Sequence, residues 1–446
     1  MATNEVRARL ERAFQAHQGG DLAEAERHYR AVLKKAPEQF EALHFYGVLK
    51  GAQGHLAQAE KLIKSALKLD PRSAPALTNY GNVLRGLGRL EEAHEAYQQA
   101  IGATPRDALV WNNLGNVQRD LTRPSEAIRS YTRAIELNPG FLEAYDNLVH
   151  SELAAGNPQA AIDVCSRVLA LFPDHLLAHT DLALALGKLE RRQEAVERYR
   201  LAQRLAPDNA LITADLVMAM GPVCDWSDIA EQTNRFLARC GHADSEVLPF
   251  IVLTASDDPQ LQSDAARAYV NNRIGPPVAG PARRPGRAGG KLNIGYLSAD
   301  FRLHPVGMLI VRLIELHDRE AFVVHGFSAG PNDGSPMRRR LETAFDQFHD
   351  VQGSSDAALA ALLRQHDIDI LIDLNGHTEN GRLAALRAHP VPVQVSYLGF
   401  PGTTGTSFID YTLVDRAVVP ADIAQHFSEQ LVSCRTASCP PTTNWR

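Results

Sequence analysis

The chain has 446 residues, a length that suggests two or three domains, and its 45% hydrophobic and 22% charged residues are ordinary for a folded protein. A net charge of −6 excludes the basic footprint of a nucleic-acid-binding protein. The five cysteines lack metal-ligand or disulfide-scaffold spacing, and no signal peptide or apolar run of membrane-spanning length is visible, so a cytoplasmic location without membrane contact is expected.

The first half of the chain is predicted to be an array of 34-residue repeats. The repeating alanines are Ala25, Ala59, Ala93, Ala127, Ala161 and Ala195, and the repeating prolines are Pro37, Pro71, Pro105, Pro139, Pro173 and Pro207. This pattern is typical of tetratricopeptide repeats, in which each helix–turn–helix buries its apolar face against the next unit. We therefore predict an α-solenoid over residues 1–221, with six full units and a partial seventh.

One position of the repeat carries a polar side chain in several units. Asn79, Asn113 and Asn147 share this position, so a solenoid would place them in a row. An amide both donates and accepts hydrogen bonds, and it can therefore pair with an extended peptide backbone whatever the peptide side chains. The same amides could instead solvate the groove or join neighbouring helices, and their spacing leaves both interpretations open. The first interpretation predicts protein or peptide partners in the repeat groove.

Two short regions separate the repeats from the second half. Residues 222–274 contain helical patterns at 229–240 and 264–272, which predict a helical adaptor with Trp226 as a packing anchor. Residues 275–290 are rich in Gly, Pro and Arg, a composition that predicts a linker.

The second half alternates between strand-like and helix-like segments. The predicted strands are 293–297, 322–327, 368–374 and 392–398, and the predicted helices are 306–317, 335–345 and 356–366. This alternation favours a Rossmann-like parallel sheet with covered faces over residues 291–432. In such sheets ligands bind at the carboxyl ends of the strands.

Two histidines follow predicted strand ends. His304 and His377 would reach the same edge of the sheet, and histidine can act as a base near neutral pH or bind sugar hydroxyls. A single loop histidine is more often a surface residue, but two on aligned loops favour a site. The loop Gly399–Gly405 could cradle a phosphate or sugar with its backbone N–H groups and hydroxyls, although any glycine-rich loop has this character.

No metal site is predicted from the spacing. Asp367 and Asp369 have the Asp-x-Asp spacing of some metal-dependent glycosyltransferases, but their place at a strand start favours a solvated strand entry. The remaining histidines of this half, His317, His325, His349 and His366, have no ligand spacing.

Three sequence segments in the second half give more specific information than residue spacing does. IGYLSADFRLHPVG, LIDLNGHT and VQVSYLGFPGTTG occur in this order, and the segment 408–411 and Asp415 follow them. Together with the repeats and the Cys224-Asp225-Trp226 junction, these strings resemble the O-linked N-acetylglucosamine transferase and SPINDLY family. The resemblance covers the chain to about residue 432.

The resemblance implies a GT-B glycosyltransferase without a catalytic metal or other cofactor, in which residues 291–432 form the amino-terminal, acceptor-side lobe. It assigns His304 to the transferred sugar or the acceptor hydroxyl, with a role as base as one option. The substrate-binding residues that it implies are Asp300, Pro305, His377, Thr378, Pro401, Gly402, Thr403, Thr404 and Gly405. The expected reaction displaces UDP from a nucleotide sugar by a Ser or Thr hydroxyl of a protein.

The end of the chain departs from the family pattern. Residues 433–446 form an atypical tail where the family continues into a donor-binding lobe, so we expect this chain to be incomplete and inactive in transfer, with poor order after about residue 418. The alternative is a non-catalytic tetratricopeptide scaffold for protein–protein interaction. The sequence leaves the donor sugar, the acceptor and the oligomeric state open.

Overall fold

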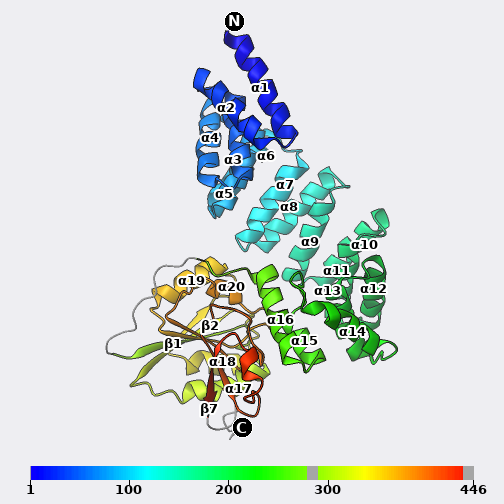
Figure 1. The fold of residues 1–446 in the computed structure, drawn as a ribbon, viewed down its shortest axis with the longest axis vertical. Helices are drawn as coiled ribbons and strands as arrows, with labels where there is room; N and C mark the ends of the chain where they lie inside the picture. Colours follow the sequence, from blue (N-terminus) through cyan, green and yellow to red (C-terminus); the bar gives the residue numbers. More distant parts are fainter. Residues whose placement is uncertain (1, 279–289, 435–446) are drawn as a thin grey trace. The chain divides into compact units, whose positions relative to one another are not determined.

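The computed structural model describes residues 2–278 and 290–434 (Figure 1). It divides into two compact units, residues 1–191 and 192–446. This boundary falls inside the sixth repeat, whereas the repeat pattern places the domain boundary after residue 221. Most of the predicted linker at 275–290 and of the predicted tail at 433–446 lies outside the described residues.

The first unit consists of eleven helices among its described residues. They are α1 (Ala2–Gln18), α2 (Leu22–Lys35), α3 (Phe40–Ala52), α4 (Leu56–Leu69), α5 (Ala74–Gly86), α6 (Leu90–Ala103), α7 (Ala108–Asp120), α8 (Pro124–Leu137), α9 (Leu142–Ala154), α10 (Pro158–Leu171) and α11 (Leu176–Lys188). Sequence neighbours pack as antiparallel pairs, so the tetratricopeptide prediction is confirmed.

The repeating small residues explain how the two helices of each pair can lie close to each other. Ala59, Ala93 and Ala127 are fully buried. A Cβ added at Gly81 would lie 2.7 Å from the ring of Tyr97, and one added at Gly115 would lie 2.5 Å from the ring of Tyr131. Such distances are shorter than atoms tolerate, so glycine is required where an aromatic ring of the second helix packs against the first helix.

The second unit begins with helices that continue the repeat pattern and then depart from it. They are α12 (Arg192–Leu205), α13 (Ala210–Met220), the short helix η1 (Gly221–Val223), α14 (Ile229–Cys240), α15 (Pro249–Ala255), α16 (Pro259–Tyr269) and η2 (Val270–Ile274). The prediction of Trp226 as a packing anchor is wrong, because 63% of this residue is exposed. Ion pairs hold the junction instead: Arg200 of α12 lies 2.9 Å from Asp225 and 2.8 Å from Asp228.

The rest of the second unit is a seven-stranded parallel sheet in the order β3-β2-β1-β4-β5-β6-β7. The strands are β1 (Leu292–Ser298), β2 (Phe322–Ser328), β3 (Gln347–Asp350), β4 (Ile370–Asp373), β5 (Val393–Tyr397), β6 (Tyr411–Asp415) and β7 (Gln430–Cys434). The helices among them are α17 (Pro305–Glu315), α18 (Pro336–Ala344), α19 (Asp356–Gln365), α20 (Leu383–Leu386) and η3 (Ala424–His426). The prediction of a Rossmann-like lobe is confirmed.

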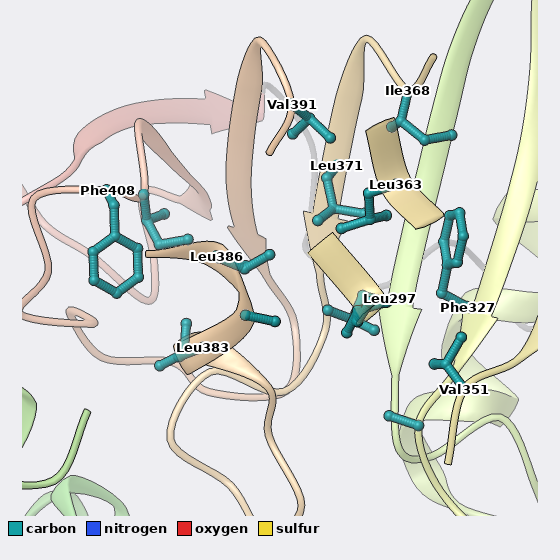
Figure 2. Close-up of a cluster of buried hydrophobic side chains, with 14 of the residues drawn as sticks. Leu297, Phe327, Val351, Leu363, Ile368, Leu371, Leu383, Leu386, Val391 and Phe408 are labelled. Carbon is teal, nitrogen blue, oxygen red and sulfur yellow. The ribbon is translucent and has the colours of Figure 1, made fainter. Parts of the chain in front are cut away.

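Two apolar cores lie on opposite faces of this sheet. On one face, Leu363 of α19 and Leu386 of α20 pack with Phe327 and Leu371 of the strands, as Figure 2 shows. On the other face, α17 and α18 cover a second buried cluster. The strands are therefore buried on both sides, which explains their continuous apolar runs.

The sheet extends further than predicted. Strands β3, β6 and β7 were not expected, and β7 includes Ser433 and Cys434 of the predicted tail. Poor order after residue 418 was also expected, but Val419 is buried and β7 pairs with β6 along its full length. The lobe thus continues to residue 434 as a sheet.

Aspartates at the starts of three strands accept backbone N–H groups from a neighbouring strand. Asp369 accepts from Asn293, Asp346 from Val324 and Asp410 from Gln394, each at 2.8 Å. Asp369 is 9% exposed, so the interpretation of the Asp-x-Asp segment as a solvated strand entry is wrong for this residue. Its carboxylate satisfies a buried backbone donor, which is a structural role.

No helix among the described residues has the length and apolar content that crossing a membrane requires.

Candidate functional site

The sheet topology brings the predicted site loops to one edge. Strands β1, β4 and β5 are adjacent and parallel, so their carboxyl ends lie at the same edge of the sheet. His304 follows β1, His377 follows β4, and the segment 401–405 follows β5. This is the adjacency that the sequence predicts, and it makes this edge the candidate site.

His304 is a partly exposed histidine at the end of the first loop. Its side chain is 35% exposed, and it caps α17 because its Nδ1 accepts the backbone N–H of Val306 at 3.3 Å. The same nitrogen lies 3.7 Å from Oδ1 of Asp300. A neutral ring whose Nδ1 accepts a hydrogen bond carries its proton on Nε2, so Nε2 can donate to a ligand oxygen. Pro305, the first residue of α17, is exposed beside it.

Asn375 joins the loops that follow β1 and β4. Its Oδ1 accepts the N–H of Ala299 at 2.7 Å, and its Nδ2 donates to Oδ2 of Asp300 and to Oγ1 of Thr378, each at 3.0 Å. Asp300 is 7% exposed and also accepts from Arg302. Because every polar atom of the Asn375 amide is used, this side chain fixes Asp300 behind His304.

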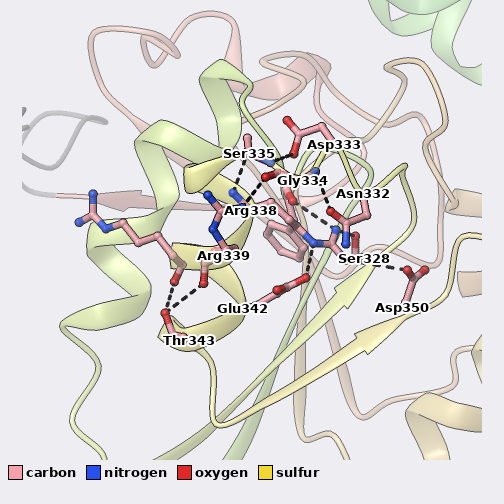
Figure 3. A network of polar contacts seen from close by, with 12 residues as sticks. Ser328, Asn332, Asp333, Gly334, Ser335, Arg338, Arg339, Glu342, Thr343 and Asp350 are labelled. Atoms are coloured by element: carbon pink, nitrogen blue, oxygen red, sulfur yellow. Dashed lines mark hydrogen bonds and ion pairs between the residues drawn. The ribbon is translucent and has the colours of Figure 1, made fainter.

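A buried arginine supports the loop of His304 from the other side, and the sequence analysis missed it. Arg338 of α18 is 2% exposed and donates to Ser328 at 2.6 Å, to Glu342 at 2.7 Å and to the carbonyl of Phe301 at 3.3 Å (Figure 3). Nearby, Asp333 accepts the N–H of Leu303 at 2.9 Å. These contacts hold the backbone on which His304 is mounted.

The loop after β4 is organised around a buried carboxylate. Asp373 accepts the N–H groups of Asn375 at 3.2 Å and Gly376 at 2.9 Å. Burial raises the pKa of Asp373 to about 6, although these two hydrogen bonds oppose the shift. Gly376 has a φ of +54°, and a Cβ there would lie 2.7 Å from Phe400, so the turn requires glycine.

His377 lies in an environment unlike that of His304. It is 2% exposed, its Nε2 is 2.6 Å from the carbonyl oxygen of Thr404, and the rings of Tyr269 and Phe400 pack edge-on against it. Burial lowers the pKa of His377 to about 4. The ring therefore stays neutral and joins the loops after β4 and β5, which differs from the substrate contact expected of it.

The hydroxyls of the segment 401–405 are also engaged within the protein. Glu429, which precedes β7, accepts from Oγ1 of Thr403 at 2.8 Å and from the backbone N–H of Thr404 at 2.6 Å. It also accepts from the hydroxyl of Thr404. The sequence analysis missed Glu429. The two threonine hydroxyls thus anchor the loop to the residue before β7.

Other residues of this loop differ in exposure. Pro401 is exposed, Gly402 is buried and Thr378 of the neighbouring loop is half-buried. Gly405 has a φ of +67°, and a Cβ there would lie 2.7 Å from backbone atoms of Ala266 and Arg267 in α16. The loop therefore approaches the adaptor helix α16 closely, and Pro401 is its part most open to a ligand.

In the first unit, two of the three predicted peptide-binding amides bond to the preceding repeat. Asn79 lies 2.9 Å from a ring nitrogen of His44. Asn147 donates to Asn112 at 3.1 Å and accepts from Arg119 at 3.0 Å. Asn113 makes no side-chain hydrogen bond to another described residue. Of the three, Asn113 has its hydrogen-bonding capacity most available to a peptide.

Comparisons with known proteins agree with both parts of this architecture. Residues 277–437 match glycosyl transferase family 41, and overlapping segments between residues 16 and 210 match the tetratricopeptide repeat. A probable UDP-N-acetylglucosamine–peptide N-acetylglucosaminyltransferase, SEC of Arabidopsis thaliana, is 39% identical over 196 residues, which are 42% of this chain and 20% of that protein.

Two further curated relatives match a shorter stretch. The UDP-N-acetylglucosamine–peptide N-acetylglucosaminyltransferase of Caenorhabditis elegans is 35% identical over 144 residues, 32% of this chain and 12% of that protein. The probable SPINDLY enzyme of Arabidopsis thaliana is 33% identical over 144 residues, 32% of this chain and 16% of that protein. The matched parts thus span a fifth or less of the length of these relatives.

Among solved structures, a mutant O-GlcNAc transferase of Thermobaculum terrenum is 24% identical with a TM-score of 0.38, covering 99% of this chain and 60% of that one. The motifs at the carboxyl edge of the sheet, the repeats and the curated relatives all agree. The chain thus joins tetratricopeptide repeats to a region that matches glycosyl transferase family 41, and it is similar to the O-linked N-acetylglucosamine transferase and SPINDLY enzymes.

Proposed function

We propose that the protein transfers N-acetylglucosamine or a related sugar from a UDP-sugar to Ser or Thr hydroxyls of other proteins. In this reaction the acceptor oxygen forms a bond to the sugar carbon, the bond from that carbon to the diphosphate oxygen breaks with its electron pair on the departing UDP, and the hydroxyl proton passes to the UDP phosphate or to water. The observation that carries the proposal is the position of His304, which is partly exposed at the carboxyl edge of the sheet and is held there by the hydrogen bond from the backbone N–H of Val306 to its Nδ1.

The hydrogen bonding of His304 favours contact with substrate over a role as general base. Its Nδ1 accepts from Val306, so the neutral ring presents a proton on Nε2. A donor of this kind stabilises an oxygen of the transferred sugar or of the acceptor. A base would need the proton on Nδ1, which would break the hydrogen bond from Val306 and turn the ring toward Asp300, 3.7 Å away.

Around His304, we propose two kinds of site residue. Pro305, Thr378 and Pro401 are open enough to contact substrate. Asp300, Gly402, Thr403, Thr404 and His377 are buried, and Gly405 packs against α16. These latter residues shape the edge by holding its loops together, and the proposed transfer step uses no metal or other cofactor.

For the repeats, we propose that they bind a polypeptide acceptor. The support is the match to the tetratricopeptide repeat, the 34-residue array and the available amide of Asn113. The scaffold alternative receives support from one observation: Glu429 already occupies the hydroxyls of the loop expected near the donor.

The test is incorporation of radiolabelled N-acetylglucosamine from its UDP-sugar into an acceptor protein mixture. It uses residues 1–446 as wild type and as His304→Ala. Incorporation that His304→Ala abolishes would support the transferase. Binding of acceptor peptides without incorporation by either protein would reject transfer and favour the scaffold.

A further inference from the structure

Three histidines outside the candidate site gather on one face of the sheet. His325 lies on β2, His349 lies on β3, and His366 directly follows α19. This is the face covered by α19, whose Leu363 packs with Phe327 of β2. The histidines come from three separate elements, so their spacing along the chain contains no ligand pattern.

The pairing of β2 with β3 explains why two of them meet. The strands are parallel, with His325 opposite Gln347 and Phe327 opposite His349. Residues two apart on a strand point to the same face, so His325, Phe327 and His349 share one face. His366 follows the end of α19 and lies near these side chains. Its backbone N–H donates to the carbonyl of Leu362.

The three rings are in direct contact. The centroids of His349 and His366 are 4.2 Å apart, those of His325 and His366 are 5.6 Å apart, and those of His325 and His349 are 5.9 Å apart. One nitrogen from each ring can be chosen so that all three nitrogens lie within 4.8 Å of one another. Phe327 stacks on His349 with a centroid distance of 4.9 Å and closes one side of the cluster.

The cluster has hydrogen-bonding capacity that no described residue satisfies. His325 is 2% exposed, and neither of its ring nitrogens has a partner within the part of the chain that the structure describes. Nε2 of His349 is likewise buried without a described partner. Buried polar atoms are almost always paired, so three unpaired ring nitrogens in one cluster require an explanation.

Protonation does not provide this explanation. Burial, together with the neighbouring His349 and His366, lowers the pKa of His325 to about 4, and burial also lowers the pKa of His349. A neutral imidazole has one ring nitrogen with a lone pair, and this nitrogen can bind a metal ion. Neutral imidazoles are the form of histidine that binds metal ions.

We propose that His325, His349 and His366 bind a Zn²⁺ ion through one ring nitrogen each. Zinc bonds to imidazole nitrogen at about 2.0–2.1 Å in tetrahedral geometry, which places the nitrogens about 3.3 Å apart. Ring rotations would close the present separations of up to 4.8 Å to this value. Three protein ligands leave the fourth position to water or to an external ligand. The ion would tie β2, β3 and α19 together and satisfy the unpaired nitrogens.

The test is zinc binding by residues 1–446, purified without a histidine tag and stripped of metal with a chelator. Affinity and stoichiometry come from competition with a chromophoric zinc chelator, and Co²⁺ substitution gives a visible spectrum that reports tetrahedral coordination. The variants are His349→Gln and His366→Gln, because these side chains are less buried than His325. The matched control is His317→Gln, a half-buried histidine of the same lobe that bonds to Tyr296 at 2.8 Å.

We expect one tight zinc per wild-type chain. Each variant should bind at least about 100-fold more weakly, because loss of a ligand exceeds the 10–100-fold cost of changing a residue behind a ligand. Zinc should raise the melting temperature of the wild type and of His317→Gln, but not that of the two cluster variants. The proposal is overturned if the wild type binds no zinc, or if folded His349→Gln and His366→Gln, checked by circular dichroism, bind it as tightly as the wild type.

Discussion

The loops after β1 and β4 resemble each other in sequence but differ in structure. Each places a histidine a few residues beyond an apolar strand. His304 is 35% exposed in its side chain and caps a helix, whereas His377 is 2% exposed and bonded to the carbonyl of Thr404. Position after a strand therefore does not determine whether a histidine is open to solvent or enclosed by its neighbours.

The largest expected effect follows from His304. Replacing it by Ala should lower sugar transfer by about 10²–10³-fold, the range typical of one lost hydrogen-bond donor at a reacting group. The free energy of unfolding should fall by about 0.5–2 kcal/mol, because the change removes the side chain that caps α17. Radiolabel incorporation and urea unfolding measure the two quantities. The exposed repeat residue His55, changed to Ala, is the control; a His304→Ala protein as active as this control would contradict the assignment.

His377 should behave in the opposite way. The change His377→Ala removes a buried ring that packs against Tyr269 and Phe400, and large buried rings cost about 3–5 kcal/mol when truncated. We expect the free energy of unfolding of the second unit to fall by about this amount in urea. If His377→Ala were as stable as His304→Ala, the structural role given to this ring would be wrong.

Asp373, in the same loop as His377, should make the stability of the protein depend on pH. Its folded pKa of about 6 lies above the ordinary value of 3.8, so its contribution to stability is fully present below pH 3.8 and is lost as pH rises through 6. The loss should be about 3 kcal/mol for a shift of this size. Asp373→Asn cannot ionise, so its stability relative to the wild type should increase between pH 4 and pH 7.5. A constant difference between the two proteins over this range would show that Asp373 titrates normally.

The smallest effects concern the repeats, where Asn113 and Asn147 form a similar contrast. Asn113→Ala should weaken binding of a verified acceptor peptide about 2–10-fold, the equivalent of one net hydrogen bond. Asn147→Ala should instead lower the stability of the first unit by about 1 kcal/mol, because it loses bonds to Asn112 and Arg119. Isothermal titration with the peptide and thermal unfolding separate the two outcomes. Equal effects of both variants on peptide binding would show that the two amides bind the peptide alike, as a row of equivalent residues.

Much of the fold could be predicted because its signals are local and repeated. The alanine and proline registers recur every 34 residues, and α14 begins and ends at the predicted residues, Ile229 and Cys240. The missed strands have weaker signals: β3 is a four-residue edge strand containing Gln, His and Asp, and β6 begins at Tyr411, the last residue of the segment 408–411.

The site was less predictable because the side chains that hold its loops in place come from distant parts of the chain. Arg338 reaches the carbonyl of Phe301, and Glu429 reaches Thr403 and Thr404, yet neither residue belongs to a recognisable motif. The burial of His377 depends on the ring of Tyr269 in the adaptor, which no local pattern indicates. Tertiary contacts, and not residue type, decide which of these groups meets solvent.

The central claim is that burial separates His377 from His304, and ring-carbon NMR of histidine-labelled protein tests it most directly. His304→Ala and His377→Ala assign the two signals. We predict that the His377 signal remains that of a neutral ring down to about pH 4 and does not move when UDP-N-acetylglucosamine and an acceptor peptide are added, while the His304 signal shifts. A His377 ring that titrates near its ordinary pKa of 6.5 and shifts with these ligands would contradict the account.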